Sequence, residues 1–140
     1  NITWQKTNPP PNLACKCFTH STETILWAQK ADRKSRHYFN YELMKEQNGG
    51  KQMKDVWTGS LTKPSEKKAG KHPTQKPEYL LERIILAATE PRAVILDPFC
   101  GSGTTGVVSI RYGRDFIGID NEEEYLLITK NRLETEYEKL

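Results

Sequence analysis

The sequence predicts an α/β fold built on parallel strands, and three observations carry that prediction. A short apolar run at 93–96 has the length of a buried parallel strand and ends at an acid, Asp97. A glycine-rich turn at 100–103 follows, and then a helical pattern. A second apolar run at 116–119 ends at another acid, Asp120. Strand, glycine turn, helix, strand and acid form the layout of one nucleoside-binding βαβ unit.

Each part of this unit has a physical role beside a ligand. Glycines let the backbone approach a ligand without a Cβ in the way, and the following helix points its free N–H groups at the crevice. A carboxylate after the second strand suits the two hydroxyls of a ribose. The carboxylate of Asp97 would repel a pyrophosphate but would pair with an ammonium group. A ligand with an amino-acid end and a ribose end fits both acids, and S-adenosylmethionine is such a ligand.

Three motifs resemble those of one protein family. Residues 97–105 (DPFCGSGTT) are similar to the cofactor motif of the DNA amino-methyltransferases, which methylate the exocyclic amine of adenine or cytosine. Residues 72–77 (HPTQKP) resemble the companion motif that precedes the cofactor loop in the permuted beta group of that family. Residues 113–120 (GRDFIGID) resemble the second-strand motif of the same group. The order and spacing make the chain similar to the C-terminal part of such an enzyme.

The resemblance implies S-adenosyl-L-methionine as cofactor and double-stranded DNA as partner. It also implies a Rossmann-like methyltransferase sheet, incomplete in this chain, with an irregular recognition insert. By resemblance, Asp97 would bind the methionine amino group and Asp120 the ribose hydroxyls, with Asn121 or Glu122 near the adenine. The other residues that the resemblance places at the cofactor are Phe99, Gly101, Ser102 and Gly103 in the loop, Thr74 and Lys76 over the methionine end, and His72.

The family's transfer motif consists of a polar residue, two prolines and an aromatic residue, and it has one partial match here. Residues 8–11 (NPPP) end in a proline, which has no ring face for stacking on a flipped base. Proline runs form loops readily, so we interpret this segment as a turn-forming loop. The catalytic residues are therefore unknown, and we expect their motif upstream of residue 1.

The chain divides into three parts. Residues 1–28 are expected to form a strand hairpin at the end of the catalytic half, with strands over 2–6 and 23–28. Residues 29–71 are polar with little periodicity, and this interval carries the target-recognition segment in the resembled family. Residues 72–140 are expected to form the S-adenosylmethionine-binding region.

Two amphipathic helices complete the predicted fold. Apolar residues recur at helical spacing through 80–88, which predicts a helix packed on the sheet. Asn121 followed by Glu124 resembles a capping box, so the last helix is predicted to begin there. Its buried side is predicted to hold Tyr125, Ile128 and Leu133.

The charge distribution is compatible with a nucleic-acid partner but does not decide it. The chain has 21 basic and 18 acidic residues, a net charge of +3. One basic cluster lies over 30–36, where Lys30, Arg33, Lys34 and Arg36 surround Asp32. A second is formed by Lys63, Lys67, Lys68, Lys71 and Lys76, with Glu66 as the single acid among them, and its first four lysines are candidate DNA contacts. Such clusters contact phosphates in some proteins and are ordinary solvated surface in others.

Cysteine usage favours a reducing, cytoplasmic setting. Cys15, Cys17 and Cys100 are too few and too odd in number for a disulfide framework. Cys15, Cys17 and His20 lack a fourth zinc ligand, so no metal site is expected. Cys100 lies inside the glycine turn, where a packing role is expected. No apolar run approaches the ~18 residues that would span a membrane, so no membrane partner is expected either.

Two interpretations remain open. The first is a DNA amino-methyltransferase, represented here by its recognition and cofactor half. The second is a non-catalytic cofactor- and DNA-binding remnant or subunit that needs a partner, either an upstream half or a second copy. An RNA or protein methyltransferase is disfavoured because the motif at 72–77 resembles the DNA group. Without central strands the sheet edges would be unpaired, so we expect the chain not to be stable and active alone.

Overall fold

The computed structural model describes residues 1–30 and 36–140. A segment near the start of the chain, with alternating apolar and polar residues, belongs to the first of its two sheets. Strand β1 (Ile2–Lys6) lies in the centre of this sheet. It pairs antiparallel with β2 (Thr22–Ile25) and parallel with β3 (Val56–Gly59). The register sets Trp4 beside Trp57, and both indole rings are buried. The predicted hairpin of β1 and β2 is therefore confirmed.

The second sheet contains the predicted βαβ unit. Strand β4 (Val94–Asp97) and strand β5 (Asp115–Gly118) pair in parallel, with Asp97 beside Gly118. Helix α3 (Thr104–Arg111) connects them. Because parallel neighbours need a crossover, the helix packs back against the same two strands. The predicted α/β fold is confirmed.

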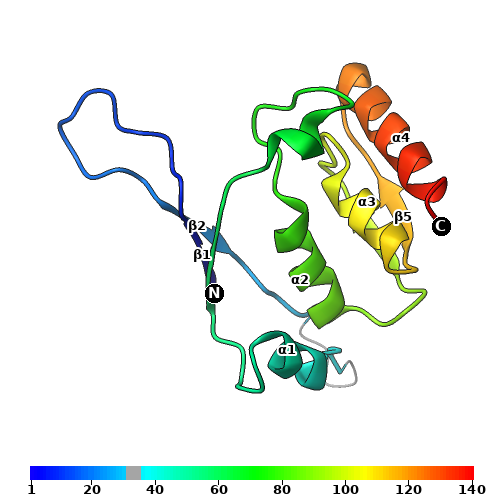
Figure 1. The fold of residues 1–140 in the computed structure, drawn as a ribbon. Helices are drawn as coiled ribbons and strands as arrows, with labels where there is room; N and C mark the ends of the chain where they lie inside the picture. The colour runs from blue at the N-terminus through cyan, green and yellow to red at the C-terminus, as the bar shows by residue number, and fades with distance from the viewer. Residues whose placement is uncertain (31–35) are drawn as a thin grey trace.

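Helix α2 (Glu78–Ala88) lies between the two sheets (Figure 1). On one side Leu80 packs against the tryptophans of the first sheet, as the stripe through 80–88 predicts. On its other sides α2 contacts α3 and the short helix α1 (Tyr41–Gln47), whose buried Met44 packs against Leu86. This helix therefore joins the insert, the first sheet and the βαβ unit.

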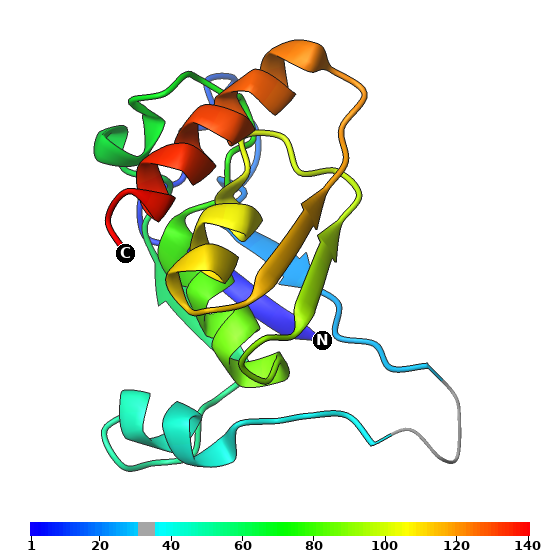
Figure 2. The same cartoon turned by 90° about the vertical axis from the view of Figure 1, so that its right-hand side faces the viewer.

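Helix α4 (Glu123–Tyr137) packs on α3, as Figures 1 and 2 show. The approach is close at Gly106 of α3, where an added Cβ would lie 2.5 Å from Phe116 and 2.8 Å from Leu133. Ile128 is buried and Leu133 is half-buried, as predicted. The buried face of α4 also carries polar residues, namely Thr129, Arg132 and Glu136.

Two predicted boundaries are wrong. The second strand covers Thr22–Ile25 instead of 23–28. The antiparallel pairing ends where Ile25 meets Ile2, the first residue of β1, so the residues after Ile25 have no strand partner in β1. The last helix is not capped by Asn121. Its N-cap is Glu122, without a side-chain cap hydrogen bond, and the helix begins at Glu123. The reason is the turn before it, where the Glu122 N–H donates to Asp120.

The insert at 29–71 is more regular than its sequence suggests. It contains α1, β3 and the 3₁₀ helix η1 (Pro64–Lys67). The four residues of β3 are too few to show a periodicity, and backbone pairing with β1 is what orders them. Of the basic cluster over 30–36, Asp32, Arg33 and Lys34 lie outside the described residues.

One face of the β4–β5 pair is exposed in the part of the chain that the structure describes, and we call it the bare face. Helix α3 covers the face opposite, and the free face is visible in Figure 2. The apolar side chains at alternate positions on the free side are half or more exposed: Val94 at 61%, Leu96 at 59%, Ile117 at 52% and Ile119 at 53%. Leu96 and Ile117 are direct cross-strand partners. A parallel sheet in a finished fold has both faces covered.

Candidate cofactor site at the glycine loop

A buried loop of residues 100–103, here called the glycine loop, connects β4 to α3. Gly103 has a φ of 74° and is the N-cap of α3. The Cys100 carbonyl accepts a hydrogen bond from the Gly103 N–H at 2.8 Å, and the Cys100 N–H donates to the Ile119 carbonyl at 2.9 Å. These bonds fix the loop at the carboxyl ends of β4 and β5, where open parallel sheets bind ligands.

Asp97 stands at the entrance of the glycine loop. Its Oδ2 accepts a hydrogen bond from the Thr105 hydroxyl at 2.6 Å, and its Oδ1 accepts from the Phe99 N–H at 3.1 Å. A carboxylate oxygen has two lone pairs, so each oxygen retains capacity for a further donor. The ring of Phe99 is 87% exposed and available to a ligand. Asp97 is the last residue of β4, and Phe99 follows it by two residues.

Asp120 faces the same loop from the end of β5. Its Oδ2 accepts a hydrogen bond from the Gly101 N–H at 2.8 Å, and its Oδ1 accepts from the Glu122 N–H at 3.1 Å. The backbone N–H of Glu122 and then that of Gly101 lower the pKa of Asp120 below its usual value. The two predicted acids therefore lie on either side of the glycine loop, and Asp120 is held as an anion.

The segment at 72–77 brings two of its predicted residues beside the loop. A Cβ on Gly101 would lie 3.0 Å from His72 Nε2, so the imidazole covers that glycine. The ring also packs edge-on against Tyr125 of α4, with centroids 4.3 Å apart. The Thr74 N–H donates to His72 Nδ1 at 3.3 Å. His72 and Thr74 therefore form one unit with the glycine loop.

Lys76 is placed elsewhere. Its ammonium lies 2.6 Å from Glu23 of β2, which also pairs with Lys6 at 2.9 Å. Burial acts to raise the pKa of Glu23, but hydrogen bonds from Lys76 and Lys6 lower it on balance. A ligand carboxylate at Lys76 would have to compete with this pair.

The side chains of two more residues of the region are buried. Ser102 is 3% exposed, and its hydroxyl lies 3.4 Å from Arg132 Nη1 on α4. Cys100 is buried, and burial raises the pKa of its thiol, so the sulfur stays protonated and unreactive. The predicted packing role of Cys100 is confirmed. Asn121 is exposed, directly after Asp120.

Sequence reasoning missed two residues that hold the loop from behind. Thr129 donates its hydroxyl to the Gly101 carbonyl, and Arg132 donates to the Ser102 carbonyl. Both are buried on α4. The only signal in the sequence is a polar stripe at helical spacing, 129, 132 and 136, which is also the pattern of a solvated face.

The lysine cluster surrounds η1. Lys63 precedes this short helix, Lys67 ends it, and Lys63, Lys68 and Lys71 are exposed. The single acid of the cluster, Glu66, turns inward, because its carboxylate accepts a hydrogen bond from the Glu78 N–H at 2.8 Å at the start of α2. The lysines are therefore left as an outward-facing basic surface.

The proline segment at 8–11 lies in a loop without helix or strand, as interpreted from the sequence. The side-chain carbonyl oxygen of Asn8 accepts a hydrogen bond from the Leu61 N–H at 2.8 Å, which fastens the loop to the end of β3. The side chain of Asn8 thus has a structural partner.

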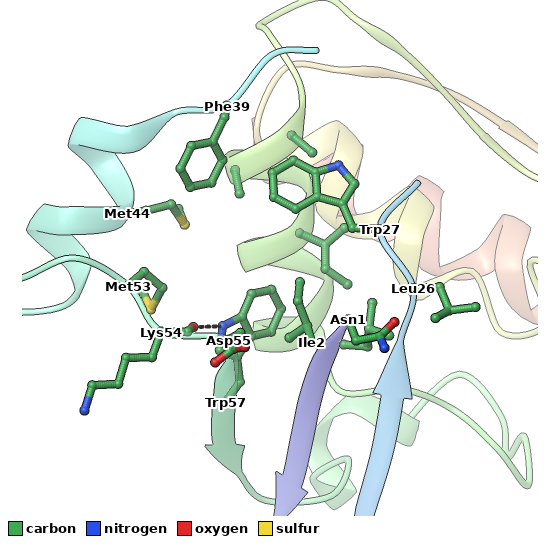
Figure 3. Close-up of a pocket in the computed structure, with 14 residues that line it drawn as sticks. Asn1, Ile2, Leu26, Trp27, Phe39, Met44, Met53, Lys54, Asp55 and Trp57 are labelled. Atoms are coloured by element: carbon green, nitrogen blue, oxygen red, sulfur yellow. Dashed lines mark hydrogen bonds between the residues drawn. The ribbon is translucent and has the colours of Figure 1, made fainter. Parts of the chain in front are cut away.

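An apolar cavity of about 310 Å³ lies apart from the glycine loop, between the first sheet, α1 and α2 (Figure 3). Its walls include the rings of Trp27 and Phe39, whose centroids are 5.4 Å apart and whose planes are tilted by 44° to each other. The indole of Trp57 donates to the Lys54 carbonyl at 2.8 Å. No predicted cofactor residue lines this cavity.

Residues 1–30 and 36–140 offer neither a metal site nor a membrane span. No group of three or more His, Cys, Asp or Glu side chains is arranged to hold a metal ion within these ranges. Within the same ranges, no helix has both the length and the apolar character needed to cross a membrane.

Comparison with known proteins identifies the family. The DNA methylase family model matches residues 1–131. The chain is 78% identical over 133 residues to the type II methyltransferase M2.LlaDCHI of Lactococcus lactis subsp. cremoris, covering 95% of this chain and 49% of that protein. It is 75% identical over 138 residues to M2.DpnII of Streptococcus pneumoniae, covering 99% of this chain and 52% of that one. The chain belongs to the DNA methylase family.

A solved structure supports the same conclusion. The M1.HpyAVI–SAM complex matches with a TM-score of 0.75 at 37% identity, over 94% of this chain and 60% of that one. The incomplete Rossmann-like sheet predicted from the motifs is therefore supported by both sequence and structure. The chain spans about half the length of the curated relatives it matches.

Proposed function

We propose that this chain is the cofactor-binding and target-recognition half of a DNA methyltransferase that transfers a methyl group from S-adenosylmethionine to the exocyclic amine of adenine or cytosine. The observation that carries the proposal is the pair of carboxylates, Asp97 and Asp120, at the ends of adjacent parallel strands on either side of one glycine loop. The relatives named as type II methyltransferases and the neighbour solved with SAM support it.

The residues present fit this cofactor. Asp97 and Asp120 keep unused lone pairs for an ammonium group and for ribose hydroxyls. Phe99 offers an exposed ring, and Asn121 is exposed near the end of β5. In this proposal Gly101, Ser102 and Gly103 contribute backbone, while His72 and Thr74 cover the methionine end. Lys76 joins them only if it leaves Glu23.

When bound, S-adenosylmethionine supplies an electrophilic methyl group on a sulfonium centre. The chain's own contribution is to hold and orient it, because the two carboxylates fix opposite ends and the loop fixes the middle. The groups that accept the hydrogens of the DNA amine are assigned to no residue of this chain. In the proposal they belong to a second half.

We propose that this second half covers the bare face of the β4–β5 pair. The exposed cross-strand pair of Leu96 and Ile117 offers it an apolar surface. The relatives exceed this chain by about half of their own length, which is enough for several helices and strands. A subunit that is inactive without such a half is the second candidate function, and the same bare face favours it.

Double-stranded DNA is the proposed partner of the lysine surface around η1. The chemistry is that of phosphate contacts, which attract DNA without reading its sequence. Inward-turned Glu66 supports this interpretation, because it removes the one negative charge from the exposed cluster.

The test is calorimetric titration of S-adenosylmethionine into the full-length polypeptide of which residues 1–140 are all or part. Asp97→Asn should weaken binding about tenfold to a hundredfold, since a charge-assisted hydrogen bond contributes roughly 1.5–3 kcal/mol. Asp115→Asn is the matched control, because Asp115 is an exposed acid at the opposite end of the same strand pair. Equal affinities of the two variants for S-adenosylmethionine would refute the proposal that the cofactor binds at the glycine loop.

A further inference from the structure

Helix α4 holds the backbone carbonyls of the glycine loop from the side opposite Asp97 and Asp120. The Thr129 hydroxyl donates to the Gly101 carbonyl at 2.8 Å, and Arg132 Nη1 donates to the Ser102 carbonyl at 2.7 Å. The same nitrogen lies 3.1 Å from the Thr104 hydroxyl at the start of α3. Two residues three positions apart on one helix therefore anchor two consecutive peptide groups.

These carbonyls decide which way the loop's peptide groups face. In a peptide unit the N–H and the C=O point in opposite directions, so fixing one fixes the other. The loop is buried, and a buried carbonyl without a partner costs free energy. With the carbonyls of residues 101 and 102 bound to α4, the following N–H groups are directed away from α4.

Arg132 also connects the glycine loop to the other cofactor motif. Its Nη2 donates to Glu78 Oε1 at 3.0 Å, and Glu78 is the first residue of α2, directly after the segment 72–77. The Arg132 side chain is 8% exposed, so this ion pair is largely shielded from water. One guanidinium thus links the glycine loop to the residue that directly follows the segment 72–77.

The geometry of this contact needs a guanidinium. A planar fork can donate to Ser102 and to Glu78 at once in fixed directions, whereas a lysine ammonium is a single point donor. The neighbouring ion pairs keep Glu78 in place, because Arg111 Nη2 lies 2.8 Å from Glu78 Oε2 and Arg111 Nε lies 2.6 Å from Glu136. Glu78 therefore presents one oxygen to each arginine.

We propose that Arg132, assisted by Thr129, is a positioning residue for cofactor binding, because it fixes the glycine loop against residues 72–78 in the shape that receives the cofactor. The proposal rests on the proposed function, in which that loop binds S-adenosylmethionine. Arg132 touches no cofactor in this role and acts through the loop's peptide groups.

The experiment compares Arg132→Met with Lys130→Met in the full-length polypeptide. Lys130 is the matched control, because it lies on the same helix with its side chain 70% exposed and only a 3.8 Å pair to Glu134. Four quantities are measured for each variant: the Kd for S-adenosylmethionine, the KM for S-adenosylmethionine, the KM for DNA, and the melting temperature without cofactor. Asp97→Asn is measured in the same series.

Arg132→Met is expected to raise the Kd and KM for S-adenosylmethionine roughly tenfold, since displaced positioning groups cost factors of this size or more, and to leave the KM for DNA within about twofold. Arg132→Lys should recover much of the melting temperature lost in Arg132→Met but little of the cofactor affinity. Lys130→Met should change none of these quantities. If Arg132 had only a structural role, Arg132→Met would change the KM for S-adenosylmethionine and the KM for DNA together. Arg132→Lys would then restore the cofactor affinity along with the melting temperature.

Unchanged cofactor affinity in Arg132→Met, or equal changes in both KM values, would overturn the proposal. If Arg132→Met does not fold, Thr129→Val decides by the same criteria, with Thr135→Val as control because the Thr135 hydroxyl only bonds its own helix. The Asp97→Asn result separates the two proposals. A loss there with no loss at Arg132 refutes the positioning role alone, whereas no loss at Asp97 refutes the cofactor site itself.

Discussion

The residue at position 103 has to satisfy two demands at once. Its φ of 74° lies in the left-handed region, and an added Cβ would lie 2.7 Å from Thr129 on α4. Only glycine meets both demands without strain. The turn chemistry and the approach of α4 are therefore set by the same residue, and the hydroxyl of Thr129 can reach the Gly101 carbonyl because of it.

Gly103→Ala should lower the free energy of unfolding by about 3 kcal/mol, because left-handed strain adds to a forced shift of α4. Gly113→Ala is the matched control, since Gly113 has a φ of 67° and open space around its Cβ position. That variant should cost only about 1 kcal/mol, from strain alone. Chemical denaturation of the two variants measures the difference, and equal losses would mean that α4 yields without cost.

Among single residues, the sequence predicted those whose type is demanded by backbone geometry or charge. Asp120 accepts a hydrogen bond from Gly101 of the loop, and Asp97 accepts one from Thr105 just after it, so these residues lie together at one end of the strand pair. Arg132 was not predictable, because a polar residue on a helix is ordinarily solvated and only the tertiary fold buries it. Asn121 failed as a cap because Asp120, one residue earlier, takes the N–H of Glu122.

Among the elements, α4 is unusual in burying a charged stripe against α2 and α3. Glu136 is 5% exposed and receives Arg111 Nε at 2.6 Å and Lys139 at 2.7 Å. The hydrogen bond from Arg111 is the largest influence, and it lowers the pKa of Glu136 to about 2 from an ordinary value of 4.5. Burial acts in the opposite direction and is outweighed.

This lowered pKa predicts an acid limb in the stability profile. A carboxyl with a lower pKa in the folded state contributes stability above its unfolded pKa, so the contribution is complete above about pH 5 and is lost as the pH falls from 4.5 toward 2. Glu136→Gln should therefore be less stable than the parent by about 3 kcal/mol at neutral pH, with the gap narrowing in acid. Glu134→Gln removes an acid from an exposed ion pair, and its free energy of unfolding should follow that of the parent at every pH. A constant gap from neutral pH to pH 2 would contradict the assignment.

The lysines around the short helix η1 are the proposed DNA contacts of this chain. Neutralising Lys67, Lys68 and Lys71 together should flatten the dependence of log Kd on log salt, by about 0.9 for each phosphate that the variant no longer neutralises. The single change Lys130→Gln is the control for an exposed charge on another helix, α4. An unaltered salt slope in the triple variant would mean that these lysines do not contact DNA phosphates and are ordinary solvated surface.

Element lengths were predicted less well than element types. The strand predicted at 23–28 covers only Thr22–Ile25, because a strand lasts only as long as its neighbour supplies backbone partners, and that neighbour is chosen by the tertiary fold. For the same reason β3 was hidden in the polar insert, since pairing with β1 orders Val56–Gly59. Helix α2 was predictable because its apolar stripe is long enough to show a period.

Across the whole molecule, the two sheets differ in how their faces are covered. The first has α2 packed on Trp4 and Trp57, whereas the β4–β5 pair has α3 on one face and exposed apolar side chains on the other. Apolar side chains at alternate strand positions are the mark of a face that packs against another layer. The proposed second half supplies that layer.

Leu96→Ser tests the proposed layer, because Leu96 lies at the centre of the bare face opposite Ile117. In the full-length polypeptide this change should lower the free energy of unfolding by about 1.5–3 kcal/mol, the value of a buried leucine. Leu127→Ser is the matched control, since Leu127 on α4 is 58% exposed and Leu96 is 59% exposed. Its loss should stay within about 0.5 kcal/mol, as for an ordinary surface position. Equal, small losses at both positions would mean that the face stays in water in the full-length protein, and that the second half must attach to the chain elsewhere.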